Sequence, residues 1–204
     1  IAERIDANLL DIPIQQLQDP LLTKQKYRAK IDVLKKKTQG KLVIKEYPTA
    51  SAHVGHFKAL LNELSLKKGF HPEIIFVDYL NICASSRYKG TIVNSYTYVK
   101  AIAEELRGLA GEYNVPILSA TQTTRSGYGN SNVEITDTSE SFGLPATADL
   151  MFALISTEDM EELNQIMVKQ LKNRYNDPTV YKRFVLGIDR QKMRLYDCDQ
   201  NAQH

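Results

Sequence analysis

Two polar residues of this chain stand directly after apolar segments that have the composition of buried strands. Asp78 follows the apolar residues 74–77, and Gln122 closes the segment 116–121. Continuous apolar runs are typical of parallel strands covered on both faces. Ligands of open α/β sheets bind outside the carboxyl ends of such strands, so an acid and an amide there indicate a nucleotide-phosphate site. The acid can hold Mg²⁺ and the amide can contact the terminal phosphate.

A second candidate group is cationic. Lys172 and Arg174 are two residues apart on a predicted strand, so both side chains project from one face. Such a pair can contact an anionic ligand, or it can be a solvated strand edge protected by charge. His53 and His56 would lie on one side of a helix, but without a third ligand we interpret them as structural, not as a zinc site.

The elements that must position these residues can be read from hydrophobic periodicity. A helix is predicted from about Asn94 or Ser95 to Tyr113, with one apolar stripe. A strand, this helix and a second strand form a right-handed βαβ unit that places Asp78 and Gln122 on neighbouring parallel strands. We also expect helices over 1–10, within 11–38 and over 53–67, strands near 41–46, 149–155 and 165–174, and a hairpin of strands 182–189 and 192–197.

Composition bounds the class of protein. The 204 residues are 43% hydrophobic and 25% charged, which suffices for one domain over 1–204 with a proper core. The net charge of +2 makes any nucleic-acid contact a local arrangement of few residues. Cys83 and Cys198 suggest no disulfide framework and fit a reducing compartment. No signal peptide or membrane-spanning stretch is expected, which predicts an intracellular, soluble protein.

Four ordered motifs carry a resemblance to a known family: residues 75–80, 118–125, 137–149 and 172–174. Together they resemble DnaB-type replicative DNA helicases, in particular the branch of T-even-like bacteriophages. The resemblance implies an α/β, RecA-like ATPase domain with a mostly parallel twisted sheet flanked by helices and a C-terminal antiparallel hairpin. It also implies ATP and Mg²⁺ as cofactors, a homo-hexameric ring around single-stranded DNA, a primase and a helicase loader as partners, and the host cytoplasm as the location if the protein is phage-encoded.

The resemblance also implies roles for single residues. Asp78 would bind Mg²⁺ through water, and Gln122 would sense the γ-phosphate and relay hydrolysis into the segment that follows it. Arg174, with Lys172 as its companion, would reach the nucleotide of a neighbouring subunit as an arginine finger. The expected DNA contacts lie in two loops and at one backbone amide: Arg125, Tyr128, Asn130, Ser131 and Asn132, then Arg87 and Lys89, and Gly143.

The DNA residues have a plain alternative, which is a polar surface loop. Arg125 can neutralise a phosphate, whereas Tyr128 can stack on a base or simply pack the loop. Where many members of the family carry an arginine, this chain has Ser139, so that one contact does not transfer.

The phosphate loop of the family, G-x-x-x-x-G-K-[ST], does not occur in these residues. We expect it, and the catalytic glutamate, upstream of Ile1. Residues 1–204 alone should then bind ATP poorly and hydrolyse almost none, while the parent protein is a helicase and ATP hydrolase. Two alternatives remain open at this point: a recombinase- or clock-type ATPase of the same fold, and a non-catalytic DNA-binding or assembly module.

Overall fold

The computed structural model describes residues 1–19, 24–88, 93–123, 134–135 and 143–199. The chain divides into two compact units. One contains residues 1–45, 154–168 and 183–204, and the other contains residues 46–153 and 169–182, so the division falls within two of the strands.

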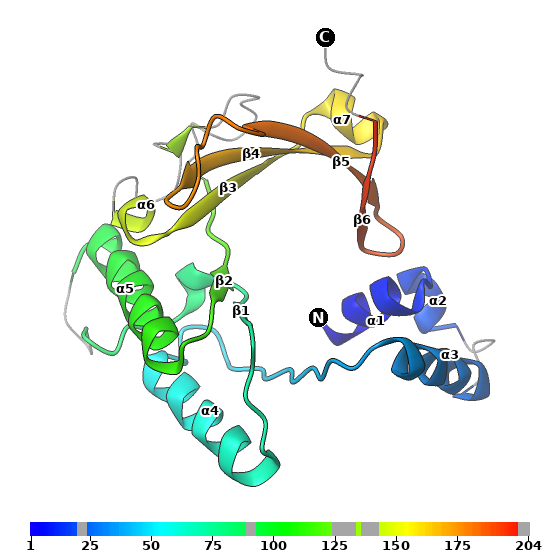
Figure 1. Ribbon diagram of the computed structural model, residues 1–204, viewed down its shortest axis with the longest axis horizontal. Coiled ribbons are helices and arrows are strands. Elements are labelled where there is room, and N and C mark those ends of the chain that lie inside the picture. Colours follow the sequence, from blue (N-terminus) through cyan, green and yellow to red (C-terminus); the bar gives the residue numbers. More distant parts are fainter. Residues whose placement is uncertain (20–23, 89–92, 124–133, 136–142, 200–204) are drawn as a thin grey trace. The chain divides into compact units, whose positions relative to one another are not determined.

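The second unit is built around a parallel pair of strands and one long helix. Strands β1 (Ile75–Val77) and β2 (Ile117–Ser119) pair in parallel, with Val77 opposite Ser119. Helix α5 (Ser95–Tyr113) connects them (Figure 1) and packs against β2. The predicted strand–helix–strand unit is confirmed by this pairing.

Helix α5 begins and ends as its sequence predicts. The Asn94 side chain accepts a hydrogen bond from the Thr97 N–H, which satisfies one of the free donors of the first turn. Asn114 closes the helix in the left-handed conformation. The apolar stripe packs on the 3₁₀ helix η1 (Leu80–Ile82) and on α6 (Gly143–Thr147), and the buried residues of this core are Leu80, Cys83, Val99, Ile102, Ala103, Leu106 and Leu144.

Helix α4 (Val54–Lys68) confirms the structural interpretation of the two histidines. The His53 ring accepts from the Gly55 N–H at 3.0 Å, and the His56 ring accepts from the His53 N–H at 3.2 Å. The two rings thus form a capping box at the start of the helix. Gly69 ends the helix at φ 57°, a conformation that glycine adopts without a steric penalty.

The remaining strands form a four-stranded sheet in the order β3 (Leu150–Ile155), β4 (Gln165–Asn173), β5 (Arg183–Asp189) and β6 (Arg194–Asp197). Strands β5 and β6 are antiparallel, with Gly187 opposite Tyr196, which confirms the predicted hairpin. A Cβ on Gly187 would overlap the Tyr196 ring, so only glycine fits there. The short helix α7 (Glu158–Glu162) lies between β3 and β4 in the chain.

The first unit holds the N-terminal helices α1 (Ala2–Leu10), α2 (Ile14–Leu17) and α3 (Lys24–Lys37). The Asn8 side chain donates to the Met193 carbonyl at 2.7 Å, which ties α1 to the turn before β6. Asp11 pairs with Lys192 at 3.0 Å and Arg194 at 3.2 Å. The hydrogen bond from Lys192 holds the pKa of Asp11 below its usual value.

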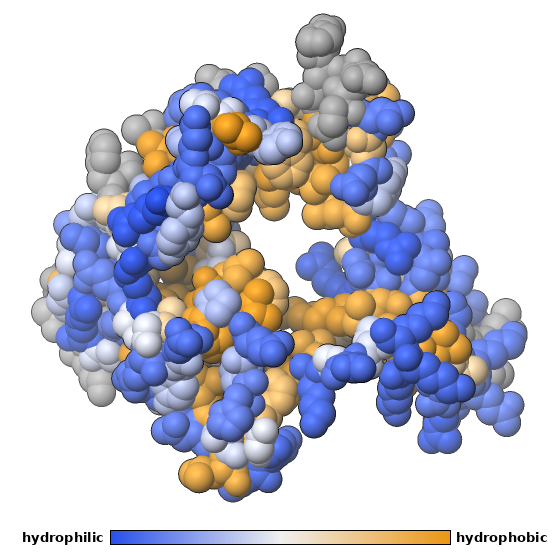
Figure 2. Space-filling model, in the orientation of Figure 1, coloured by the Kyte–Doolittle hydropathy of each residue, from blue (hydrophilic) through white to orange (hydrophobic). Residues whose placement is uncertain are grey.

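Two expectations about the strands are wrong. Residues 41–46 form no strand, and Leu42, Val43 and Ile44 are exposed, because no described segment offers them a hydrogen-bonded edge. The apolar runs before Asp78 and Gln122 are not buried on both faces either. Phe76 is 68% and Leu118 46% exposed, and Figure 2 shows hydrophobic surface over β1 and β2. No helix in the described part of the chain is long and apolar enough to cross a membrane.

Candidate functional site

Asp78 and Gln122 lie at the same edge of the parallel pair. Each follows its strand within a few residues, and the backbone beyond the strands is joined by the Leu80 N–H, which donates to the Ala120 carbonyl at 3.1 Å. The Gln122 amide donates to the hydroxyl of Tyr79, the residue next to Asp78, at 3.4 Å. The βαβ topology therefore brings the acid and the amide together, as the sequence predicts.

Asp78 is exposed, and its carboxylate is free of ion pairs and hydrogen bonds within the described residues. A free carboxylate at an open edge suits Mg²⁺, which binds through one or two carboxylates and keeps several waters. In the same part of the chain no cluster of three or more His, Cys, Asp or Glu side chains forms a closed metal cage. The single carboxylate therefore fits a magnesium ion that keeps most of its water ligands.

A cationic cluster surrounds the C-terminal end of α6. Its three cations each donate to one of the last carbonyls of this helix: Lys172 to Pro145, Arg174 to Ala146 at 2.6 Å, and Arg107 to Thr147 at 2.7 Å. Cations stabilise a helix C-terminus because the free carbonyls there carry partial negative charge. The cluster joins α5, α6 and β4, and it confirms that Lys172 and Arg174 project to the same side.

Asp149 provides the negative charge of this cationic cluster. Its carboxylate accepts from Arg107 at 2.8 Å and from Arg174 at 3.2 Å. The hydrogen bond from Arg107, with the further charges of Arg174 and Lys172, holds the pKa of Asp149 below its usual value. Partial burial, followed by repulsion from Arg174, lowers the pKa of Lys172. Sequence reasoning missed Arg107 and Asp149 as members of the site, because their partners are 25 to 42 residues away.

The loop after η1 is fixed to α5 by two acids. Glu105 is buried and accepts from the Ser85 hydroxyl at 2.6 Å, the Ser86 N–H at 2.9 Å and the Ser86 hydroxyl at 2.7 Å. Burial alone would raise the pKa of Glu105, but these hydrogen bonds outweigh it and lower the pKa. The guanidinium of Arg87, a predicted DNA contact, pairs with Glu104. DNA would have to compete with this pair.

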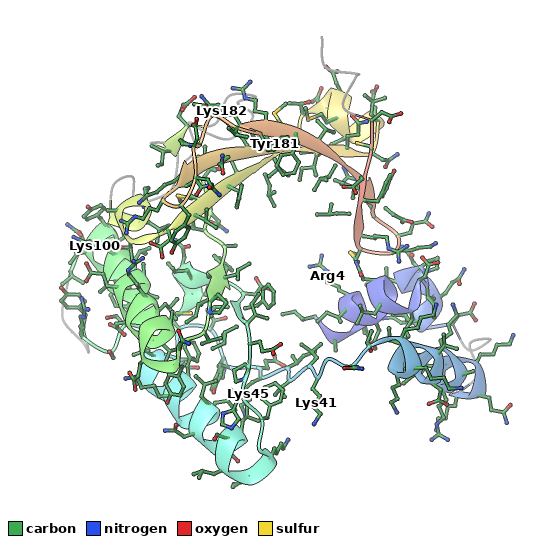
Figure 3. The ribbon with its side chains drawn as sticks, in the orientation of Figure 1. Arg4, Lys41, Lys45, Lys100, Tyr181 and Lys182 are labelled. Carbon is green, nitrogen blue, oxygen red and sulfur yellow. The ribbon has the colours of Figure 1, made fainter. Side chains whose placement is uncertain are left out.

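Gly143 is buried at the start of α6. A Cβ there would lie 2.9 Å from the side chain of Lys100, which is labelled on α5 in Figure 3. The glycine therefore permits close packing of α6 on α5. The other predicted DNA contacts lie outside the described residues: Lys89, Arg125, Tyr128, Asn130, Ser131 and Asn132.

Comparison with known proteins gives one consistent answer. The profile of the DnaB-like helicase C-terminal domain family matches residues 1–184. The chain is 43% identical over 202 residues to a DnaB-like replicative helicase of Enterobacteria phage T4, covering 98% of this chain and 42% of that protein. The chain thus spans less than half of the length of this relative.

Two solved structures share the fold at 16% identity and cover 97% of this chain. One is a DnaB-like replicative helicase studied with its interactions with primase (TM-score 0.74, 47% of that chain), and the other is the ATPase domain of G40P (TM-score 0.75, 69% of that chain). With the family profile over nine tenths of its length and a close phage relative, this chain belongs to the DnaB-like helicase C-terminal domain family.

Proposed function

We propose that residues 1–204 are a RecA-like ATPase domain of a replicative DNA helicase. In this proposal the protein translocates on single-stranded DNA as a hexameric ring, driven by ATP, and unwinds duplex DNA at the fork. The observation that carries the proposal is the juxtaposition of Asp78 and Gln122 at the carboxyl end of the parallel pair. Membership in the DnaB-like helicase C-terminal domain family supports DNA as the proposed partner.

Nucleotide binding would use both strand ends. Asp78 would hold Mg²⁺ through water, and Gln122 would face the γ-phosphate. Because Gln122 directly precedes the segment from Thr123 onward, a change at the phosphate would pass into that segment along the backbone. Bound Mg²⁺ would neutralise the charge that develops on the phosphates. The phosphate loop that must complete this site is expected upstream of Ile1.

Lys172 and Arg174 would act on the nucleotide of a neighbouring subunit. Lys172 lies in β4 and Arg174 directly follows this strand. Both are distant in sequence from Asp78 and Gln122, and both present their cationic groups from one face. A guanidinium supplied in trans stabilises the charge of the transferring phosphoryl group. This role requires a ring of identical subunits, which we propose is a hexamer, assembled with a primase and a loader as partners.

Single-stranded DNA would contact Arg125, Tyr128, Asn130, Ser131 and Asn132, with Arg87, Lys89 and the Gly143 amide as further contacts. Few cations in such a track allow the motor to release its DNA at each step. In the plain alternative these residues form a polar surface loop that does not contact DNA. A substitution at Arg125 distinguishes the two.

In the protein extended upstream to include the phosphate loop, Arg125→Ala should weaken single-stranded DNA binding and reduce its salt dependence. Removing one cation that neutralises a phosphate changes the slope of log K against log salt by about 0.7 for single strands. Nucleotide affinity should stay near the unsubstituted value, because Arg125 is not part of the phosphate site. The measurement is fluorescence anisotropy of a labelled oligonucleotide over a series of salt concentrations.

The matched control for this titration is Arg125→Lys, which keeps the charge and should keep the slope. If Arg125→Ala binds DNA as well as the unsubstituted protein at low salt, Arg125 is not on the track.

The recombinase- or clock-type ATPase is disfavoured by the family match, since its defining relatives would be of another family. A non-catalytic DNA-binding or assembly module would hydrolyse no ATP, even in a longer form of the protein, whereas the helicase would. ATPase assays of residues 1–204 beside a longer protein distinguish the module from the helicase.

A further inference from the structure

Arg174, the proposed arginine finger, already makes hydrogen bonds within its own chain. The Arg174 guanidinium donates to the Ala146 carbonyl and to the Asp149 carboxylate, and the Lys172 ammonium donates to the Pro145 carbonyl. A guanidinium has five N–H donors in a fixed fork, and bidentate binding of a phosphate uses two of them on one edge. The contacts to Ala146 and Asp149 engage both terminal nitrogens of Arg174, so this edge of the guanidinium is directed at groups of its own subunit, and it must turn away from them to present the same donors to a phosphate elsewhere.

The groups that bind Arg174 in its own chain resemble the phosphate that it would bind in a neighbouring subunit. A carboxylate and a helix C-terminus both carry negative charge, as does the γ-phosphate, so the two sites compete for the same cation. Asp149 is one third exposed and Arg174 nearly half exposed. Pairs of this exposure are weak, about two- to fivefold in an equilibrium constant, and a doubly charged phosphate can displace them.

We propose that the C-terminal end of α6 and Asp149 form a holding site for Arg174 and Lys172 within one subunit, from which a neighbour's nucleotide must draw both cations. This inference rests on the proposed function, because it takes Arg174 as the finger. Asp149 is then a positioning residue that sets how readily the composite site closes.

Arg107 gives the holding site a second, opposing control. It donates to the same Asp149 carboxylate oxygen as Arg174 and to the Thr147 carbonyl of α6, so the two arginines share the charge of Asp149. Its charge also repels Lys172, whose pKa is lowered in part by Arg107. Removing Asp149 should therefore free the finger, whereas removing Arg107 should leave Asp149 entirely to Arg174 and hold the finger more tightly.

A purely structural role for the cluster predicts a different pattern. If the cluster only joins α5, α6 and β4, both substitutions remove a bond and both weaken the same packing. Their effects on the kinetics would then have the same sign. Opposite signs on kcat are expected only if the two residues act on the availability of Arg174.

The test is steady-state ATPase at saturating single-stranded DNA in the protein extended upstream to include the phosphate loop. Asp149→Asn should raise the kcat about two- to fivefold, and Arg107→Gln should lower it by a similar factor. The KM for ATP should change little in both, because Arg174 leaves the holding site only to stabilise charge that develops in the transition state. Glu63→Gln on α4, which removes a surface pair with Lys67, is the control and should leave kcat unchanged.

The outcomes separate the holding site from the finger itself. If Arg174→Ala retains turnover, the finger proposal fails and the holding site with it. If Arg174→Ala loses turnover while Asp149→Asn and Arg107→Gln shift kcat in the same direction or not at all, only the holding site is overturned. Thermal melting reports whether each variant folds, and Asp149→Ser carries the same expectation should Asp149→Asn fail to fold.

Discussion

Arg174→Ala in the protein extended upstream should lose most of its DNA-stimulated ATPase, on the order of 10³-fold in kcat, and keep its nucleotide affinity. The reason is that the guanidinium stabilises charge that develops only in the transition state of phosphoryl transfer, and in a neighbour's site. Turnover is measured at saturating ATP and DNA, and affinity with a fluorescent nucleotide analogue.

Arg194→Ala is the matched control for this loss. Arg194 has the same side-chain exposure as Arg174, 44%, and also pairs with a carboxylate at 3.2 Å, that of Asp11. Its removal should leave kcat within about twofold, the effect of losing one surface pair. Equal losses in the two variants would show that Arg174 matters only as a surface ion pair.

The second large effect concerns which part of the protein is needed for ATP hydrolysis. Purified residues 1–204 should show no DNA-stimulated ATPase above background, because the strand ends that carry Asp78 and Gln122 lack the backbone amides and lysine of a phosphate loop. A longer protein that includes G-x-x-x-x-G-K-[ST] should restore turnover in the ordinary enzymatic range of about 1–10³ per second. The measurement is phosphate release with and without single-stranded DNA.

Two results would contradict this expectation. Robust turnover by residues 1–204 would mean that the nucleotide site lies elsewhere in this chain. A longer protein with the phosphate loop but no turnover would favour the non-catalytic module. Circular dichroism of the fragment should accompany the assay, so that inactivity is compared between folded proteins.

The local part of the fold was predictable because its signals are local. The stripe of α5, its Asn94 cap and the turn between β5 and β6 depend on residues within one turn or hairpin of each other. The pairing of β1 with β2 followed from the handedness of a βαβ unit. For the same reason, the shared edge of Asp78 and Gln122 could be predicted from the order of the elements alone.

Other features depend on partners that no local pattern reveals. Residues 41–46 have a strand composition, but a strand needs a neighbouring edge and this segment finds none among the described residues. The stretch before Asp78 predicted burial on both faces, yet Phe76 is exposed.

The candidate site also contains residues that could be predicted from the sequence and residues that could not. Lys172 and Arg174 were visible as a two-residue spacing on one strand. Arg107 looked like an ordinary solvated residue off the apolar stripe of α5, and Asp149 like the start of a strand. Only the approach of α6 to β4 turns these four residues into one cluster.

The central claim, that one subunit completes its neighbour's site, is tested most directly by mixing two inactive variants of the extended protein. Arg174→Ala keeps its own Asp78 but presents no finger, and Asp78→Ala has no metal site but presents Arg174. In mixed rings an Asp78→Ala subunit can supply Arg174 to an Arg174→Ala neighbour, so the mixture should recover part of the ATPase that each variant lacks alone. If mixed rings form, as shown by native mass spectrometry, and no hydrolysis returns, Arg174 acts within its own subunit and the account is contradicted.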